Sequence, residues 1–263
     1  MAQKRSFLTS YFLLFFTILI YLFLYIPIAI LIIYSFNNSS VPYIWEGFSL
    51  RWYRELFSSF EILQALKNSL IVAFSAMSLS LIMGVLFVFY STKNNLSKLL
   101  VLFYGNLAAP EIILAVSLLS FFSLFSIPLG LTTLIVGHTL IGLGYVIPVV
   151  QSRFSELDKR FTEASLDLGA TQNQTFVRII LPLLSPALLA AGLLVFIISL
   201  DDFIVSFFTS GGSTQTLPIY IFSMVRSGAT PVVNALSTLL LVISSIAVVL
   251  FSLVQVKKMD MFS

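Results

Sequence analysis

Long apolar runs recur along the chain, and they constrain its fold more than any other feature. The first covers residues 11–34, 24 residues without a single Asp, Glu, Lys or Arg. A helix needs about 20 such residues to cross the hydrocarbon core of a bilayer. The runs are continuously apolar, whereas the strands of a membrane barrel alternate between apolar and polar residues. The sequence therefore predicts an all-α, polytopic membrane protein with six transmembrane helices, at 11–34, 68–91, 99–125, 132–152, 183–208 and 235–256.

The composition agrees with this fold class and argues against several functions. Of 263 residues, 59% are hydrophobic and 10% are charged, against about 25% charged in a typical soluble domain. A net charge of +3 without a basic stripe argues against a nucleic-acid partner. With no cysteine and one histidine, His138, we expect neither a disulfide nor a metal site. We interpret residues 1–263 as one transmembrane domain surrounded by membrane lipid.

The distribution of basic residues predicts the orientation. Ten Lys and Arg lie before residue 11, at 92–98, at 153–182 and after residue 256, whereas four lie at 35–67 and 209–234. Cytoplasmic loops carry the excess of basic residues, so both termini are expected in the cytoplasm.

The two outer segments, 35–67 and 209–234, are long for simple connections between helices. The first contains both tryptophans, Trp45 and Trp52, beside Tyr43 and Tyr53. Such a cluster is typical of an interfacial aromatic belt, and a docking surface is the alternative.

The longest cytoplasmic segment, 153–182, has the pattern of two short helices. Apolar residues at helical spacing end at Gly169, which can adopt the left-handed conformation of a helix cap. Thr171 and Gln174 then form a capping-box pattern, and a second apolar face continues to Pro182. Such a pair can bind in a groove of a soluble partner, or it can be a surface helix that only connects the spans.

Four ionisable residues lie within the predicted spans, where such groups are rare and costly: Glu111, His138, Asp201 and Asp202. The spans contain no Lys or Arg to neutralise the charge of the acids, whereas a cationic substrate would neutralise it. Alternatively, Asp201 and Asp202 reach water at the outer face or pair with a partner subunit. Glu111 follows Pro110, which opens a helix and suits a cavity wall. We expect His138 to be structural and satisfied by a carbonyl of a neighbouring helix.

The cytoplasmic segment resembles the EAA loop of ABC-importer permeases. Six positions agree, namely Glu163, Ala164, Gly169, Ile179, Leu181 and Pro182, while Ser165 replaces the usual Ala. The resemblance implies the type I ABC importer permease (MetI-like) fold, in which this loop docks into an ATPase. The residues expected at the coupling contact are Glu163, Ala164, Ser165, Asp167, Gly169 and Ala170. The chain has no G-x-x-x-x-G-K-[ST] motif, so ATP and Mg are expected in a partner ATPase, and we expect no cofactor or catalytic residue in this chain.

Six further segments resemble one branch, the second permease of spermidine/putrescine importers: YIPI at 25–28, SFN at 35–37, AAPEI at 108–112, SLDD at 199–202, LPIYIFSMVRSG at 217–228 and PVVNAL at 231–236. This resemblance implies polyamine transport. Glu111 stands where that branch has aspartate, a change that affects substrate fit rather than charge. The predicted substrate path consists of Asp201, Asp202, Glu111, Ser199, Trp45 and Tyr220. Tyr90, Tyr104 and Tyr145 are further candidates for cation–π contacts.

The resemblance also implies a location and partners. It places the chain in the bacterial cytoplasmic (inner) membrane with a homologous second permease, an ATPase dimer and an outer polyamine-binding protein. Three alternatives stay open. The same machinery could carry another cation such as ferric iron, intramembrane acids could relay ions in a secondary transporter, or the chain could be a membrane scaffold.

Overall fold

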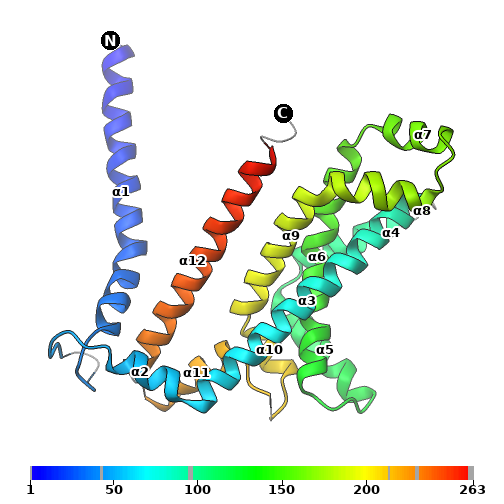
Figure 1. Cartoon of the computed structure of the whole chain (residues 1–263). Helices are drawn as coiled ribbons and strands as arrows, with labels where there is room; N and C mark the ends of the chain where they lie inside the picture. The colour runs from blue at the N-terminus through cyan, green and yellow to red at the C-terminus, as the bar shows by residue number, and fades with distance from the viewer. Residues whose placement is uncertain (1, 42–43, 94–96, 213, 229–230, 260–263) are drawn as a thin grey trace. The chain divides into compact units, whose positions relative to one another are not determined.

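The computed structural model describes residues 2–41, 44–93, 97–212, 214–228 and 231–259. Within these residues the regular secondary structure is helical, apart from an isolated bridge between Asn37 and Phe48. The elements are α1 (Ala2–Ser35), α2 (Arg51–Ser58), α3 (Phe60–Lys93), α4 (Ser97–Ala108), α5 (Glu111–Leu124), α6 (Leu131–Glu156), α7 (Lys159–Asp167), α8 (Gln172–Thr175), the π-helix η1 (Phe176–Ile180), α9 (Leu181–Asp201), α10 (Ile204–Thr209), α11 (Leu217–Ser227) and α12 (Pro231–Met259) (Figure 1).

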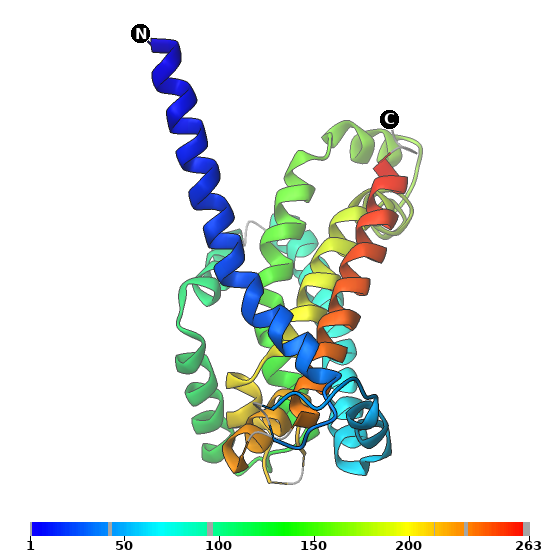
Figure 2. The same cartoon turned by 90° about the vertical axis from the view of Figure 1, so that its left-hand side faces the viewer.

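The chain divides into two compact units. The first contains residues 1–60 and 223–243, and the second contains residues 61–222 and 244–263. Within the second unit, α7 and α8 lie at one end and α5 and α10 at the opposite end, in both views (Figures 1 and 2).

The all-α membrane fold is confirmed. Among the described residues, four helices are long and apolar enough to cross a membrane: Phe12–Ser35, Phe60–Ser91, Leu131–Glu156 and Gln172–Asp201. Two shorter apolar helices, Glu111–Leu124 and Pro231–Ile246, correspond to the other two predicted spans.

The prediction of one continuous helix over 99–125 is wrong. Helix α4 ends at Ala108 and α5 begins at Glu111. Pro110 between them has φ −57° and ψ 129°, an extended conformation. A proline has no N–H to donate and disfavours helical backbone in the residue before it, so the break falls here. The predicted opening at Pro110 is therefore a complete interruption.

Two boundaries of the predicted span 183–208 are also wrong. The span ends at Asp201, because Asp202 is extended with φ −68° and ψ 120°, and α10 starts two residues later. At the other end Pro182 does not separate the cytoplasmic segment from the span. Helix α8 continues through η1 into α9, where Pro182 lies in the first turn and needs no N–H partner.

Small residues let the helices of the second unit approach closely. A Cβ added to Gly142 of α6 would lie 2.8 Å from Cγ1 of Val195 in α9 and would also collide with Ser80 of α3. Helix association in membranes depends on such close packing. The contact holds α6 against α3 and α9, one turn from His138.

Candidate substrate pathway and coupling site

Asp201 and Asp202 stand where α9 breaks, and their side chains have different surroundings. The Asp202 carboxylate is buried and accepts hydrogen bonds from the backbone N–H groups of Ser206, at 2.7 Å, and Val205, at 3.3 Å. It thereby caps α10, whose first N–H groups have no partner within the helix. Asp201, the last residue of α9, is exposed. That both acids contact the substrate stays a prediction.

His138 of α6 joins both sides of this break. Its Nδ1 lies 2.7 Å from Oγ of Ser199 in α9, and its Nε2 lies 3.0 Å from Oγ of Ser206 in α10. The same Nε2 is 3.4 Å from Oδ2 of Asp202. The residue is 1% exposed, so the predicted burial is confirmed. The predicted carbonyl partner is wrong, because two hydroxyls and a carboxylate surround the ring.

Glu111 reaches the same region from the start of α5. Helix α5 packs against α10 through Ala115, Leu118 and Phe122, with Val205 between them. This packing places the carboxyl groups of Glu111 and Asp202 close enough to interact, 91 positions apart in sequence. Two neighbouring carboxylates repel each other when both are ionised, and either a shared proton or a nearby cation offsets that repulsion.

The remaining predicted pathway residues are distributed over both units. Ser199 is buried, with its hydroxyl on His138. Trp45 is 49% exposed on the loop between α1 and α2 in the first unit, and its ring contacts Tyr34 edge-to-face. Tyr220 is partly buried in α11 of the second unit. Tyr43 lies outside the described residues.

The three other tyrosines have separate locations. Tyr145 lines a closed, narrow crevice together with His138 and Ser199, so it lies near the acids but packed among them. Tyr104 instead donates a hydrogen bond from its hydroxyl to Oε1 of Gln151 at 3.0 Å. Tyr90 is exposed near the C-terminal end of α3.

Residues 153–182, the segment predicted to be cytoplasmic, fold only partly as predicted. The reversal at Gly169 and the capping box are confirmed, but the first helix is interrupted, because α6 continues to Glu156, Leu157 is extended and α7 begins at Lys159. Gly169 has φ +84°, a conformation that favours glycine, and the chain reverses there between α7 and α8. Thr171 and Gln174 form the capping box, with bonds of 2.8 and 3.3 Å. Of the predicted coupling residues, Glu163, Ala164, Asp167 and Gly169 are exposed, Ala170 is partly buried and Ser165 is buried.

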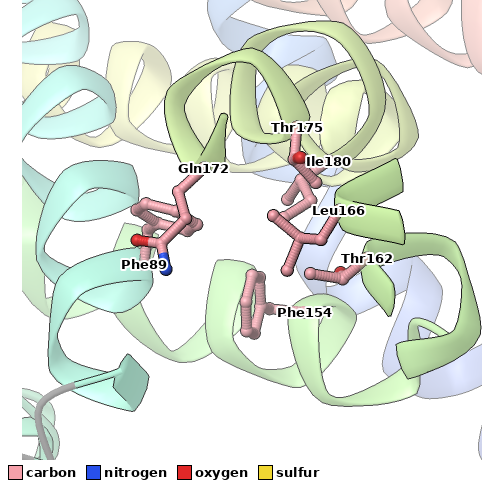
Figure 3. Close-up of a pocket in the computed structure, with 7 residues that line it drawn as sticks. All are labelled: Phe89, Phe154, Thr162, Leu166, Gln172, Thr175 and Ile180. Carbon is pink, nitrogen blue, oxygen red and sulfur yellow. The ribbon is translucent and has the colours of Figure 1, made fainter. Parts of the chain in front are cut away.

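Ser165 connects the two short helices. Its hydroxyl lies 2.9 Å from Oγ1 of Thr175, which itself donates to the carbonyl oxygen of Thr171 at 3.1 Å. Since the Thr175 hydrogen is used in that bond, Ser165 is the donor. Behind the segment lies a cavity of about 230 Å³, seen in Figure 3, lined by Phe89, Phe154, Thr162, Leu166, Gln172, Thr175 and Ile180.

Comparison with curated proteins identifies the family. The spermidine/putrescine transport system permease protein PotC of Haemophilus influenzae is 41% identical over 248 residues, covering 92% of this chain and 95% of that protein. The chain belongs to the family of spermidine/putrescine ABC transport permeases. PotC of Escherichia coli is 41% identical, with 89% of this chain and 90% of that protein covered. The putrescine permease PotI of E. coli is 37% identical, with 83% and 82% covered. No family model matches.

Solved structures of ABC importers share the fold of this Pot-family permease. A chain of a bacterial alginate importer has a TM-score of 0.74 at 16% identity, with 97% of this chain and 96% of that chain covered. The same kind of importer, in complex with an alginate-bound periplasmic protein, gives 0.70 at 18% identity, with 94% and 93% covered. A chain of the inward-facing methionine transporter MetNI gives 0.60 at 18% identity, with 75% and 97% covered.

Sequence reasoning missed Ser206, Thr175 and Asn37 of this Pot-family chain. All three are buried and take part in hydrogen bonds that organise predicted site residues. A weak signal existed for one of them. Asp202 precedes the short run that forms α10, and an acidic residue before such a run indicates a helix cap. Serine and threonine partners carried no comparable pattern.

Proposed function

We propose that this chain is a permease subunit of an ATP-driven importer and forms the path by which spermidine or putrescine enters the cytoplasm. The observation that carries the proposal is the pair of helix breaks, at Pro110 and Asp202, which brings Glu111 beside Asp202 with Asp201 exposed next to them. The names of the relatives, spermidine/putrescine and putrescine permeases, support the same substrate class.

The chemistry of the substrate fits these groups. Polyamines carry several ammonium groups joined by methylene chains, so they need separated carboxylates and apolar or aromatic walls. Asp201 offers an exposed carboxylate, and Glu111 and Asp202 offer a second acidic position. Tyr220 and Trp45 offer aromatic faces, each worth about 0.5 to 2 kcal/mol toward a cation.

In this mechanism the cytoplasmic segment transmits the motion of a partner ATPase. The exposed residues Glu163, Ala164 and Asp167 would contact the ATPase, which binds ATP and Mg. Closure of the ATPase dimer shifts the permease toward its outward-open state only if that state binds the partner better. Helix Gln172–Asp201 connects the coupling segment directly with the acids.

The proposal includes partners and a location. A homologous second permease completes the path, and an outer binding protein delivers the polyamine. A periplasmic protein occupies this role in the alginate importer complex, which supports the arrangement. The chain would lie in the bacterial cytoplasmic membrane with both termini in the cytoplasm, as the distribution of Lys and Arg indicates.

Uptake by the complete importer in proteoliposomes tests the function. We expect ATP-dependent accumulation of labelled spermidine or putrescine, and loss of uptake without ATP. Accumulation of ferric iron but not of polyamine would show that the importer carries a different cation. Uptake that survives without ATP but stops with an uncoupler would make the chain a secondary transporter, and no uptake of any cation would refute the proposal.

A further inference from the structure

The outer loop between α1 and α2 is organised around one buried residue, Asn37. Asn37 is 2% exposed, and its side chain makes three hydrogen bonds. Nδ2 donates to the carbonyl oxygen of Ile44 at 2.6 Å. Oδ1 accepts from the N–H groups of Glu46, at 2.9 Å, and Ser39, at 3.3 Å. Both ends of the amide are therefore engaged by the loop.

Two of these bonds bracket Trp45. The carbonyl of Ile44 and the N–H of Glu46 belong to the two peptide groups on either side of that residue, so the Asn37 amide fixes the backbone through which the indole is attached. The ring is held separately by Tyr34 of α1, at 6.1 Å between centroids and 82° between planes. Trp45 is 49% exposed, so its ring is accessible rather than buried.

Other contacts hold the base of the loop without the Asn37 side chain. The backbone carbonyl of Asn37 accepts from Nε1 of Trp52 at 2.7 Å, and the rings of Phe36 and Phe48 stack at 5.3 Å. These contacts survive a change of the side chain at position 37. The side-chain amide therefore acts on the segment that carries Trp45 and not on the attachment of the loop.

We propose that Asn37 is a positioning residue that presents the indole of Trp45 to the ammonium groups of the incoming polyamine. The proposal rests on the proposed function, in which Trp45 is part of the substrate path. A cation–π contact depends on ring placement, and a preformed loop spares the substrate the cost of ordering it. Loss of the amide therefore weakens substrate affinity more than it slows the transport cycle.

The test compares four variants in the assembled importer: Asn37→Ala, Asn37→Asp, Trp45→Ala and the matched control Asn38→Ala, which changes the exposed neighbour. Hydrogen exchange of the amides of Ser39 and Glu46 reports loop order, and uptake kinetics report substrate affinity. In Asn37→Ala we expect exchange at Ser39 and Glu46 to rise at least about threefold, as loss of one hydrogen bond implies. We expect KM for polyamine to rise as it does in Trp45→Ala, with maximal rate largely kept.

Asn37→Asp keeps the acceptor for Glu46 and loses the donor to Ile44, so we expect an intermediate KM. If Asn37→Ala does not assemble, amide exchange and KM measured in Asn37→Asp test the proposal instead. Unchanged exchange at Ser39 and Glu46, or faster exchange with an unchanged KM, would overturn the proposal. If Trp45→Ala alone leaves KM unchanged while the importer still carries polyamine, the positioning role fails and the proposed function stands.

Discussion

Nε2 of His138 lies 3.4 Å from Oδ2 of Asp202, inside a network that also contains Ser199 and Ser206. One side chain of α6 thus connects the end of α9 with the start of α10. The contact turns Asp202 toward the interior while the adjacent Asp201 is exposed. Two neighbouring acids therefore have different physical roles.

Replacing His138 by Ala is expected to destabilise the permease, because Ser199, Ser206 and Asp202 lose a shared partner in a buried position. Each buried polar group left without a partner costs about 1 to 3 kcal/mol. Thermal unfolding of the detergent-solubilised chain measures this loss. Thr238→Val is the matched control, since Oγ1 of Thr238 is buried with no partner among the described residues. Equal melting temperatures for His138→Ala and the wild type would contradict the prediction.

Asparagine substitutions should separate the roles of the two aspartates. Asp201→Asn removes an exposed charge, so we expect uptake at low polyamine concentration to fall about tenfold or more, with normal stability. A tenfold loss of affinity corresponds to about 1.4 kcal/mol of binding free energy. Asp202→Asn keeps one oxygen, which can accept from the N–H of Ser206 or of Val205, whereas Asp202→Ala removes both acceptors. We expect the alanine variant to lose more stability, by about 0.5 to 2 kcal/mol. Similar melting curves for both Asp202 variants would argue against the cap.

The length of the acidic side chain at position 111 is expected to set substrate fit. Glu111→Asp keeps the charge but withdraws the carboxyl group by one methylene from Asp202, so the preference between spermidine and putrescine should change while uptake persists. Glu111→Gln removes the charge and should reduce uptake of both. Competition uptake with the two labelled polyamines measures this. An unchanged preference in Glu111→Asp together with full uptake in Glu111→Gln would exclude Glu111 from the path.

The bond between Ser165 and Thr175 is expected to stiffen the coupling segment. Ser165→Ala removes the donor while Thr175 keeps its bond to Thr171, so stability should fall by about 1 kcal/mol or less. The larger effect should be on coupling, seen as more ATP hydrolysed per polyamine transported. Ser155→Ala, at the exposed end of α6, is the control for removing a hydroxyl, since its Oγ donates only to the carbonyl oxygen of Ser152. A normal ratio in Ser165→Ala would show that the bond is dispensable for coupling.

Gly142→Ala is expected to prevent correct packing of α6, because the added Cβ meets side chains of both α3 and α9. Overpacking of this kind costs about 1 to 3 kcal/mol. Gly105→Ala in α4 is the matched control, since nothing lies within 4 Å of its added Cβ. Yield of folded permease in the membrane distinguishes the two, and equal yields would contradict the expected collision.

The sequence predicted the membrane class, the coupling segment and the reversal at Gly169 because each depends on local patterns. Charge-free runs report lipid exposure, and Gly169 with the capping box at Thr171 and Gln174 reports local backbone geometry. The break at Asp202 was missed because no proline or glycine marks it, and an acidic residue before a short apolar run is only a weak sign of a helix cap. The pairing of Asp202 with His138 joins distant parts of the chain, and single-sequence patterns contain no information about such pairings.

The unbroken helix from Gln172 to Asp201 has a mechanical consequence. At 1.5 Å per residue its 30 residues extend about 45 Å, and the π-helical turn η1 and Pro186 inside α9 are the two places along it where a helix bends most readily. A displacement at Thr171 is therefore either absorbed at these two places or carried on to Asp201. In the proposed mechanism, η1 and Pro186 decide how much of the movement of the coupling segment arrives at the acids.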